Sequence, residues 1–218
     1  MKYNSVKIIK LAASICGVSG LVILIVIFWP IIEYQFFSSS NYKTLLSPLV
    51  AQPQSYQKTD YTKASTWFPS AETQAFVGSE AKYYNLSIPK LDISNAVVAI
   101  GGEDLTKYLV QYPGTALPGK RGNAVIFGHS VLPIFYNPKS YKAIFSTLPT
   151  LKKGDDIFVT YDGVDYHYMV EEMFEIYPSD IQILEQNSSD SFLTLVTCVP
   201  PGDPRNPKRL IVRARVVS

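Results

Sequence analysis

The sequence predicts an all-β domain that follows a single membrane-spanning helix near the N-terminus. From Lys82 onward, short alternating runs of apolar and polar residues stand between turn signals, a pattern typical of a sandwich or barrel. Aromatic residues make up 13% of the chain and 15 prolines punctuate it, which suits a β domain with many turns better than a helical bundle. In contrast, the run from Leu11 to Ile32 contains no charged side chain, and this run predicts the helix.

The apolar run has the length of a membrane anchor. As a helix it spans roughly 33 Å, against about 30 Å of hydrocarbon in a bilayer. Three lysines precede the run and Glu33 is the first charge after it, so we expect residues 1–10 in the cytoplasm and the rest of the chain outside. A cleaved signal peptide, with Ser38-Ser39-Ser40 as its cleavage site, is the alternative. The run exceeds the usual apolar length of such peptides, about 7 to 15 residues, which favours a retained anchor at residues 11–32.

Residues 33–81 are mixed in composition and predict a connector that lifts the domain off the membrane. We expect one or two short helices in it, the second at Ser70 to Phe76. The domain itself is expected at residues 82–218, with a tight hairpin at Asp162-Gly163. Its predicted strands are Tyr84 to Ile88, Ala96 to Ile100, Asn123 to Phe127, Asp156 to Tyr161, Tyr166 to Tyr177, Phe192 to Thr197 and Arg209 to Val216. Its predicted helical turns are Asp104 to Leu109, Tyr141 to Leu148 and Asp180 to Leu184.

The last two predicted strands carry the residues that are candidates for catalysis. Cys198 closes the buried strand that begins at Phe192, just before a loop rich in Pro and Gly, so its thiol is held rigidly at a strand end. Arg209 opens the next strand, and an antiparallel pair could set its guanidinium beside the sulfur. Cys16 lies within the apolar run, which leaves Cys198 as a lone thiol in an exported domain. A small buried side chain is the bland interpretation of such a cysteine.

Three motifs resemble the sortase family, the membrane-anchored cysteine transpeptidases that join proteins to the cell wall or to one another. They are Thr194-Leu195-Val196-Thr197-Cys198, the run Arg209-Leu210-Ile211-Val212 that follows it, and an earlier strand and turn ending in Gly128-His129-Ser130. The motifs occur in the order that the family has, and the resemblance covers roughly Lys82 to Val217. It leans toward the pilin-polymerising or housekeeping-like classes.

The resemblance implies a fold, a reaction and a set of site residues. The fold would be a closed sortase-type β-barrel of about seven to eight strands with short helices. Cys198 would attack a sorting-signal peptide similar to Leu-Pro-x-Thr-Gly, His129 would act as acid and base, and Arg209 would stabilise the oxyanion. Thr197 would add a backbone or hydroxyl donor. Whether the site lowers the pKa of the thiol, or the active ion pair is a minor population, stays open.

The implied partners follow from the same resemblance. They are surface proteins that bear sorting signals, an amine acceptor from a cell-wall precursor or a pilin lysine, and the membrane that holds a single-pass anchor. Sortases that assemble pili insert an Asp-Pro-aromatic lid into the active site. Trp67-Phe68-Pro69 lacks that order, so we expect these aromatic side chains to pack on the outside of the barrel.

Several alternatives are weighed against these assignments. His167 lies within an alternating strand without a Gly-His-Ser turn, so we expect it to be structural. Arg205, Arg213 and Arg215 compete with Arg209, which alone begins the Arg-Leu-Ile-Val run. The function itself has two rivals: a thiol peptidase that hydrolyses the acyl-enzyme with the same Cys198 and His129, and an inactive membrane-tethered scaffolding module.

Composition argues against two further classes of function. The net charge of +2 is small and spread out, which gives no basis for nucleic-acid binding. The two His and the available Cys have no metal-ligand spacing. Asp155-Asp156 and Glu171-Glu172 could hold calcium, but acidic pairs at turns are usually solvated, so we predict no metal and no cofactor.

Overall fold

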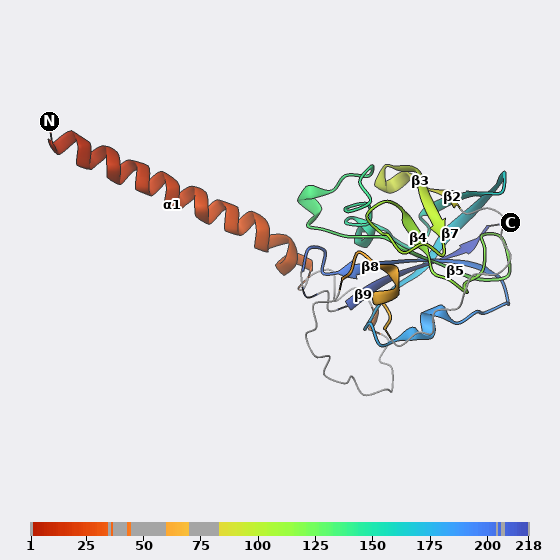
Figure 1. Cartoon of the computed structure of the whole chain (residues 1–218). Coiled ribbons are helices and arrows are strands. Elements are labelled where there is room, and N and C mark those ends of the chain that lie inside the picture. The colour runs from red at the N-terminus through yellow and green to blue at the C-terminus, as the bar shows by residue number, and fades with distance from the viewer. Residues whose placement is uncertain are drawn as a thin grey trace.

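A computed structural model describes residues 2–34, 36, 43–44, 60–69, 83–203, 205 and 208–217. The N-terminal helix α1 runs from Lys2 to Glu33 and projects away from a β-barrel (Figure 1). Its segment Ile9–Trp29 has a mean hydropathy of 2.7 and lies exposed, so α1 is long and apolar enough to cross a membrane. The expected N-terminal apolar helix is confirmed. The helix expected at Ser70 to Phe76 falls outside the described residues.

Eight of the described strands close into a barrel. The pairing order is β7-β6-β2-β3-β4-β5-β8-β9, and pairing of β9 with β7 completes the ring, while β1 adds to the outer edge of β7. The strand bounds are β1 Lys43–Thr44, β2 Tyr83–Ile88, β3 Ile93–Ile100, β4 Leu109–Gln111, β5 Gly122–Phe127, β6 Asp156–Tyr161, β7 Val164–Ile176, β8 Ser191–Val199 and β9 Lys208–Val216. The predicted all-β class and closed barrel are confirmed.

Short 3-10 helices connect the strands of the barrel. Their bounds are η3 Ala64–Thr66, η4 Pro89–Leu91, η5 Pro133–Phe135, η6 Leu148–Thr150 and η7 Ile181–Leu184. The predicted helical turn at Asp180 to Leu184 coincides with η7. Residues 141–147 form successive turns that lead into η6, as expected. The segment Asp104 to Leu109 contains a turn, but Leu109 already belongs to β4, a strand whose three residues are too few to show a period in the sequence.

Two apolar clusters lie on opposite faces of β5, β8 and β9. The first fills the barrel and includes Leu195 and Val212. The second lies outside, and Val196, Cys198 and Ile211 belong to it. Both faces of β8 are therefore covered, and all nine of its residues are buried. This double burial explains why the strand is a nearly continuous apolar run, without the polar alternation of a half-exposed strand.

Candidate active site

Strands β8 and β9 place the predicted nucleophile and arginine directly opposite each other. Cys198 pairs with Arg209 in the antiparallel register, as the spacing of the two motifs predicts. Both side chains are on the outer face of the barrel, where Cys198 is 4% exposed and Arg209 is fully buried. The thiol and the guanidinium are thus held by two strands that pair with each other along almost their whole length, from Phe192–Arg215 to Val199–Lys208, with little freedom to separate.

The end of β5 brings His129 to the same place. β5 runs parallel to β8, with Phe127 opposite Val196. The backbone N–H of Gly128 donates to the carbonyl of Val196 at 3.1 Å, and the Ser130 hydroxyl donates to the carbonyl of Cys198 at 2.7 Å. Because the residues on both sides of His129 are hydrogen-bonded to residues 196 and 198, the backbone at His129 is held next to the end of β8. Together these bonds assemble the predicted Cys, His and Arg set.

Gly128 has to be a glycine for this approach. A Cβ on it would lie 2.4 Å from the Phe145 ring and 2.7 Å from the Leu109 side chain. The glycine thus lets the chain turn between packed side chains immediately before His129.

Thr197 lies differently from its neighbour Cys198. Its side chain alternates to the other face of β8, and its hydroxyl donates to the carbonyl of Gly128 at 2.8 Å. The residue is fully buried. Its hydroxyl therefore holds the end of β5 against β8, which is a positioning role. The two roles expected for Thr197, a backbone donor or a hydroxyl donor to the substrate, stay predictions.

The segment 60–69 covers the outer face of this site. Trp67 and Phe68 are fully buried in the outer cluster together with Cys198. The Trp67 ring stacks on Phe127 at 5.3 Å between centroids and lies 6.0 Å from the His129 ring. The aromatic side chains do pack on the outside of the barrel, as expected, but they do so directly over the predicted catalytic residues. The sequence had not favoured a lid, because the order of the aromatic motif differs.

Two aromatic residues of this covering segment contact the Arg209 side chain. Its guanidinium carbon lies 5.4 Å from the centroid of the Tyr61 ring and 5.3 Å from that of Trp67, in cation–π geometry. Its Nη2 donates to the carbonyl oxygen of Trp67 at 3.4 Å, and its Nη1 donates to the carbonyl of Lys208 at 3.2 Å. A backbone carbonyl of the chain itself thus stands where Arg209 could hold a substrate carbonyl.

Hydrogen bonds to the loop that precedes β4 hold segment 60–69 in place. The Ala64 N–H donates to the carbonyl of Glu103 at 3.0 Å, and the Leu105 N–H donates to the carbonyl of Thr62 at 2.9 Å. The Ser65 hydroxyl adds a bond to the Glu103 carboxylate at 3.0 Å. These bonds join the segment to a connecting loop and not to a strand ladder, and the Ser65 bond is exposed.

In this covered conformation, burial favours the neutral forms of both titrating groups. It raises the pKa of the Cys198 thiol, and the nearby Arg209 guanidinium offsets this only in part. Burial also lowers the pKa of His129, against the opposing effect of the Asp104 and Asp60 carboxylates. A thiol and a neutral imidazole are therefore the favoured pair while segment 60–69 is in place. Of the two possibilities that the sequence left open, the geometry favours a minor active ion pair for this state.

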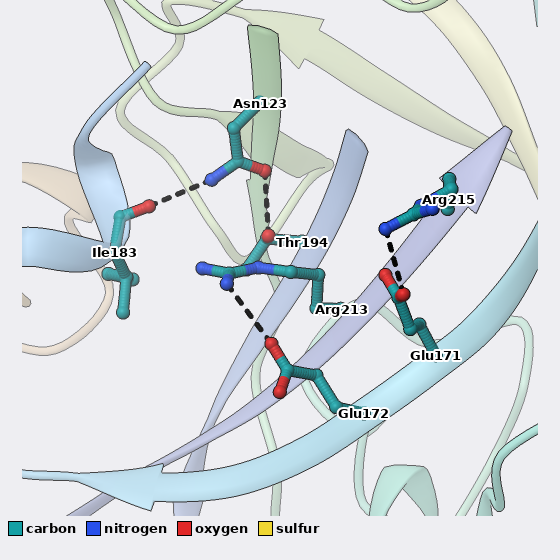
Figure 2. Close-up of polar contacts among 7 residues, drawn as sticks. All are labelled: Asn123, Glu171, Glu172, Ile183, Thr194, Arg213 and Arg215. Atoms are coloured by element: carbon teal, nitrogen blue, oxygen red, sulfur yellow. Dashed lines mark hydrogen bonds and ion pairs between the residues drawn. The ribbon is translucent and has the colours of Figure 1, made fainter. Parts of the chain in front are cut away.

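The competing arginines have other partners. On the same outer face of β9, Arg213 is ion-paired with Glu172 at 3.1 Å, and Arg215 with Glu171 at 2.9 Å (Figure 2). Arg205 is paired with Asp203 at 2.6 Å. Of the two acidic pairs considered for calcium, Glu171-Glu172 therefore binds arginines across the β7–β9 ladder, whereas Asp155 is paired with Lys90 and Asp156 with His167.

The second histidine, His167, lies within the sheet and away from the predicted catalytic residues. His167 contacts Asp156 at 2.7 Å and stacks on Phe158, within the β6–β7 ladder. Figure 2 also shows Asn123 joining Thr194 at 2.7 Å to the carbonyl of Ile183 at 2.8 Å, which ties β5 to β8 further down from the site.

Comparison with known proteins identifies the family of this chain. A family model described as the sortase domain matches residues 86–217, more than half of the chain. The chain belongs to the sortase family. It is 28% identical over 178 residues to Sortase A of Bacillus anthracis, a match that covers 76% of this chain and 79% of that protein. It is 26% identical over 166 residues to Sortase A of Streptococcus agalactiae serotype III (strain NEM316), covering 73% of this chain and 64% of the relative.

A solved structure extends the comparison to the fold. A Clostridium perfringens Sortase D5 transpeptidase superimposes with a TM-score of 0.54 at 27% identity, covering 65% of this chain and 82% of the other. The matched region contains all the predicted site residues and excludes the anchor, since the family match begins within β2 at residue 86.

Sequence reasoning missed the residues that shield the site. Tyr61 and Trp67 contact Arg209 from more than 140 positions away in the sequence, and no local pattern links them to it. The cluster of two adjacent aromatic residues, Trp67 and Phe68, before a Pro was the available signal. It indicated burial but not the surface that the two side chains cover.

Proposed function

We propose that this sortase-family chain is a cysteine transpeptidase that forms a thioester on Cys198. The donor is a sorting-signal peptide similar to Leu-Pro-x-Thr-Gly, cleaved after Thr, and the acceptor is an amine of a cell-wall precursor or a pilin lysine. The observation that carries the proposal is the alignment of Cys198 with Arg209 across β8 and β9, with His129 held beside them by the bonds of its two neighbours.

The first half-reaction acylates the thiol. The Cys198 proton passes to His129, and the sulfur attacks the Thr carbonyl carbon, so that a C–S bond forms and the carbonyl oxygen takes on negative charge. Arg209, permanently charged and with forked donors, stabilises that oxyanion. The C–N bond then breaks, and the departing amine takes the proton from His129. The products of this step are the thioester and a free Gly amine.

The second half-reaction transfers the acyl group. An acceptor amine gives a proton to His129 and attacks the thioester carbon, which forms a new amide and releases the Cys198 thiolate. The proton on His129 returns to the sulfur. No net oxidation or reduction occurs, and the chain ends in its starting protonation state.

The covering segment has to leave before a peptide can bind. Trp67 supplies the carbonyl that Arg209 contacts in the covered state, and a donor peptide would replace it with its own scissile carbonyl. Removal of the Trp67 and Tyr61 rings also exposes the thiol to water. That exposure reverses the burial that raises the pKa of Cys198 and leaves the lowering effect of Arg209 in place.

The membrane placement of the chain belongs to the same proposal. Residues 1–10 lie in the cytoplasm, residues 11–32 form the single-pass anchor, residues 33–81 form the connector and residues 82–218 form the extracytoplasmic catalytic domain. The length and hydropathy of Ile9–Trp29 and the lysines that precede it support this topology.

The test is ligation by the full chain in detergent micelles. A fluorescent Leu-Pro-x-Thr-Gly peptide is incubated with an amine, and the products are identified by mass spectrometry for wild type and Cys198→Ala. We expect an amine-joined product that disappears in the variant. Hydrolysed peptide alone would favour the thiol peptidase or an amine that the site does not accept, and no turnover of any tested signal would favour a different motif or the inactive scaffold.

A further inference from the structure

The end of the anchor helix is bonded to the catalytic end of the barrel. Tyr34, which follows the apolar span by five positions, donates its hydroxyl to the Glu175 carboxylate at 2.6 Å, and both side chains are buried. The other oxygen of Glu175 accepts from Lys208 at 2.8 Å. Lys208, whose side chain is 25% exposed, immediately precedes Arg209, so one polar cluster links the membrane helix to the start of β9. At about 1.5 Å per residue, Tyr34 lies only roughly 7 Å beyond the end of the span.

The loop after His129 lies at this same end of the barrel. Ser130 is bonded to Cys198, and Leu132 packs so closely on the β8–β9 loop that a Cβ on Gly202 would lie 2.6 Å from its side chain. Figure 1 shows the green loop that contains η5 on the side of the barrel where α1 arrives. The short helix η5, Pro133–Phe135, therefore belongs to a loop held at the same end of β8 and β9 as the Lys208–Glu175–Tyr34 contacts.

The tip of this loop is apolar and exposed. Ile134 is 59% exposed and Phe135 is 64% exposed, more than any other large hydrophobic side chain within residues 83–203 and 208–217. Lys139 and Lys142 follow and are also exposed, and the sequence has no Asp or Glu between Asp104 and Asp155. An apolar tip followed by two exposed lysines fits the boundary between acyl chains and anionic headgroups.

We propose that Ile134 and Phe135 insert into the outer leaflet of the bilayer that holds α1, so that the catalytic end of the barrel faces the membrane. The Tyr34–Glu175–Lys208 cluster sets the height of the barrel, and the loop tip fixes its tilt. Cys198, Arg209 and His129 then open toward substrates held at the membrane surface. This inference rests on the proposed membrane topology, but not on the transpeptidase reaction.

The test measures membrane depth on the full chain in lipid vesicles. Cysteine is introduced at Phe135 in a Cys16→Ala, Cys198→Ala background and labelled with bimane, and quenching is recorded with lipids that carry either a shallow or a deep spin label. Val164→Cys is the matched control, because Val164 is 49% exposed at the β6–β7 hairpin, at the opposite end of β7 from Ile176 and Arg209. Val22→Cys, inside the apolar span, reports whether the anchor is inserted.

We expect loss of most of the fluorescence at positions 22 and 135, and none at position 164. Quenching at 22 with equal, weak signals at 135 and 164 would overturn the inference while leaving the anchor in place. No quenching at 22 would overturn the topology and this inference with it. Because labelling needs no turnover, failure of the transpeptidase proposal would leave these readings unaffected.

A second measurement links the contact to function. The Ile134→Ser/Phe135→Ser variant is compared with Val164→Ser on a soluble donor peptide and on the same peptide attached to a lipid in the vesicle. We expect the loop variant to keep its rate on the soluble peptide and to lose rate on the lipid-attached one. Equal rates on both donors for wild type and both variants would contradict the orientation.

Discussion

The two ends of the barrel carry similar residues and use them differently. At one end, Arg209 is fully buried between the Tyr61 and Trp67 rings and faces Cys198. Further along the same face of β9, Arg213 and Arg215 are partly exposed, lie over aromatic rings, and bind Glu172 and Glu171. Arginine is thus a catalytic candidate at one end of the barrel and part of a surface ion pair at the other.

This contrast teaches that position in the register, and not residue type, defines the site. Arg213 and Arg215 are ion-paired with carboxylates, whereas Arg209 lies against two aromatic ring faces and donates to two backbone carbonyls beside Cys198. The two histidines differ in the same way. His129 lies half-buried at the end of β5, and His167 contacts Asp156 on the β6–β7 surface.

The largest effect is expected from His129→Gln. Loss of the acid and base should lower kcat/KM for peptide ligation by about 10²–10⁴-fold, the usual contribution of such a group. His167→Gln is the matched change at the other end of the barrel and should leave kcat/KM near the wild-type value. Equal losses in the two variants would show that the effect comes from folding and not from chemistry.

Arg209→Lys should come next. It keeps the charge but removes the fork of donors, and we expect kcat to fall by about 10²–10³-fold, as for loss of an oxyanion donor. Arg213→Lys makes the same chemical change further along β9 and should leave kcat unchanged. If kcat stays at the wild-type value and only KM rises for Arg209→Lys, then Arg209 binds substrate without stabilising the transition state.

Trp67→Ala should make Cys198 more reactive. Burial raises the pKa of the thiol in the covered state, so its thiolate fraction at neutral pH is below that of an ordinary cysteine. Uncovering the thiol leaves Arg209 to lower the pKa, and each unit of decrease gives about tenfold more thiolate well below the pKa. Iodoacetamide alkylation followed from pH 6 to pH 10 should therefore be faster, with its midpoint at lower pH.

The control for this experiment is Phe158→Ala, which truncates a 40% exposed aromatic side chain on β6. Its alkylation profile should overlay that of the wild type. A Trp67→Ala profile that also overlays the wild type would mean that segment 60–69 does not govern access to the thiol.

The smallest effect is expected for the Arg213–Glu172 ion pair on the outer face of β9. Glu172→Gln removes an ion pair whose partners are 51% and 29% exposed, so we expect at most about 1 kcal/mol of lost stability, and less at high salt. Urea unfolding of wild type and variant at low and high salt measures it. A loss well above that range, independent of salt, would mean that the pair supports the barrel rather than its surface.

Most of the fold and the identities of the catalytic candidates could be predicted from the sequence. The strands that carry Cys198 and Arg209 are long apolar runs, and their spacing sets the two residues opposite each other. β4 was missed because three residues show no period, and β1 because two residues do not. A strand is predicted from its local pattern of apolar residues, so the prediction succeeds for the long strands β8 and β9 and fails for the short strands β1 and β4.

The burial and the contacts of the site residues could not be predicted from local sequence patterns. The burial of Arg209 depends on Tyr61 and Trp67, and the inward direction of Thr197 depends on strand parity combined with closure of the barrel. Glu175 appears in the sequence as an ordinary acidic residue of a strand, yet it is fully buried between Tyr34 and Lys208. Each of these features arises from contacts between distant segments, which no local window contains.

The most direct test of the central claim is detection of the acyl-enzyme by intact mass. The full chain is mixed with a Leu-Pro-x-Thr-Gly peptide without amine, quenched in acid, and digested to locate the adduct. We predict an acyl group on the peptide that contains Cys198, released by hydroxylamine, and less of it in Arg209→Lys but not in Arg213→Lys. An adduct on another residue, or ligation that proceeds without any adduct, would contradict the account.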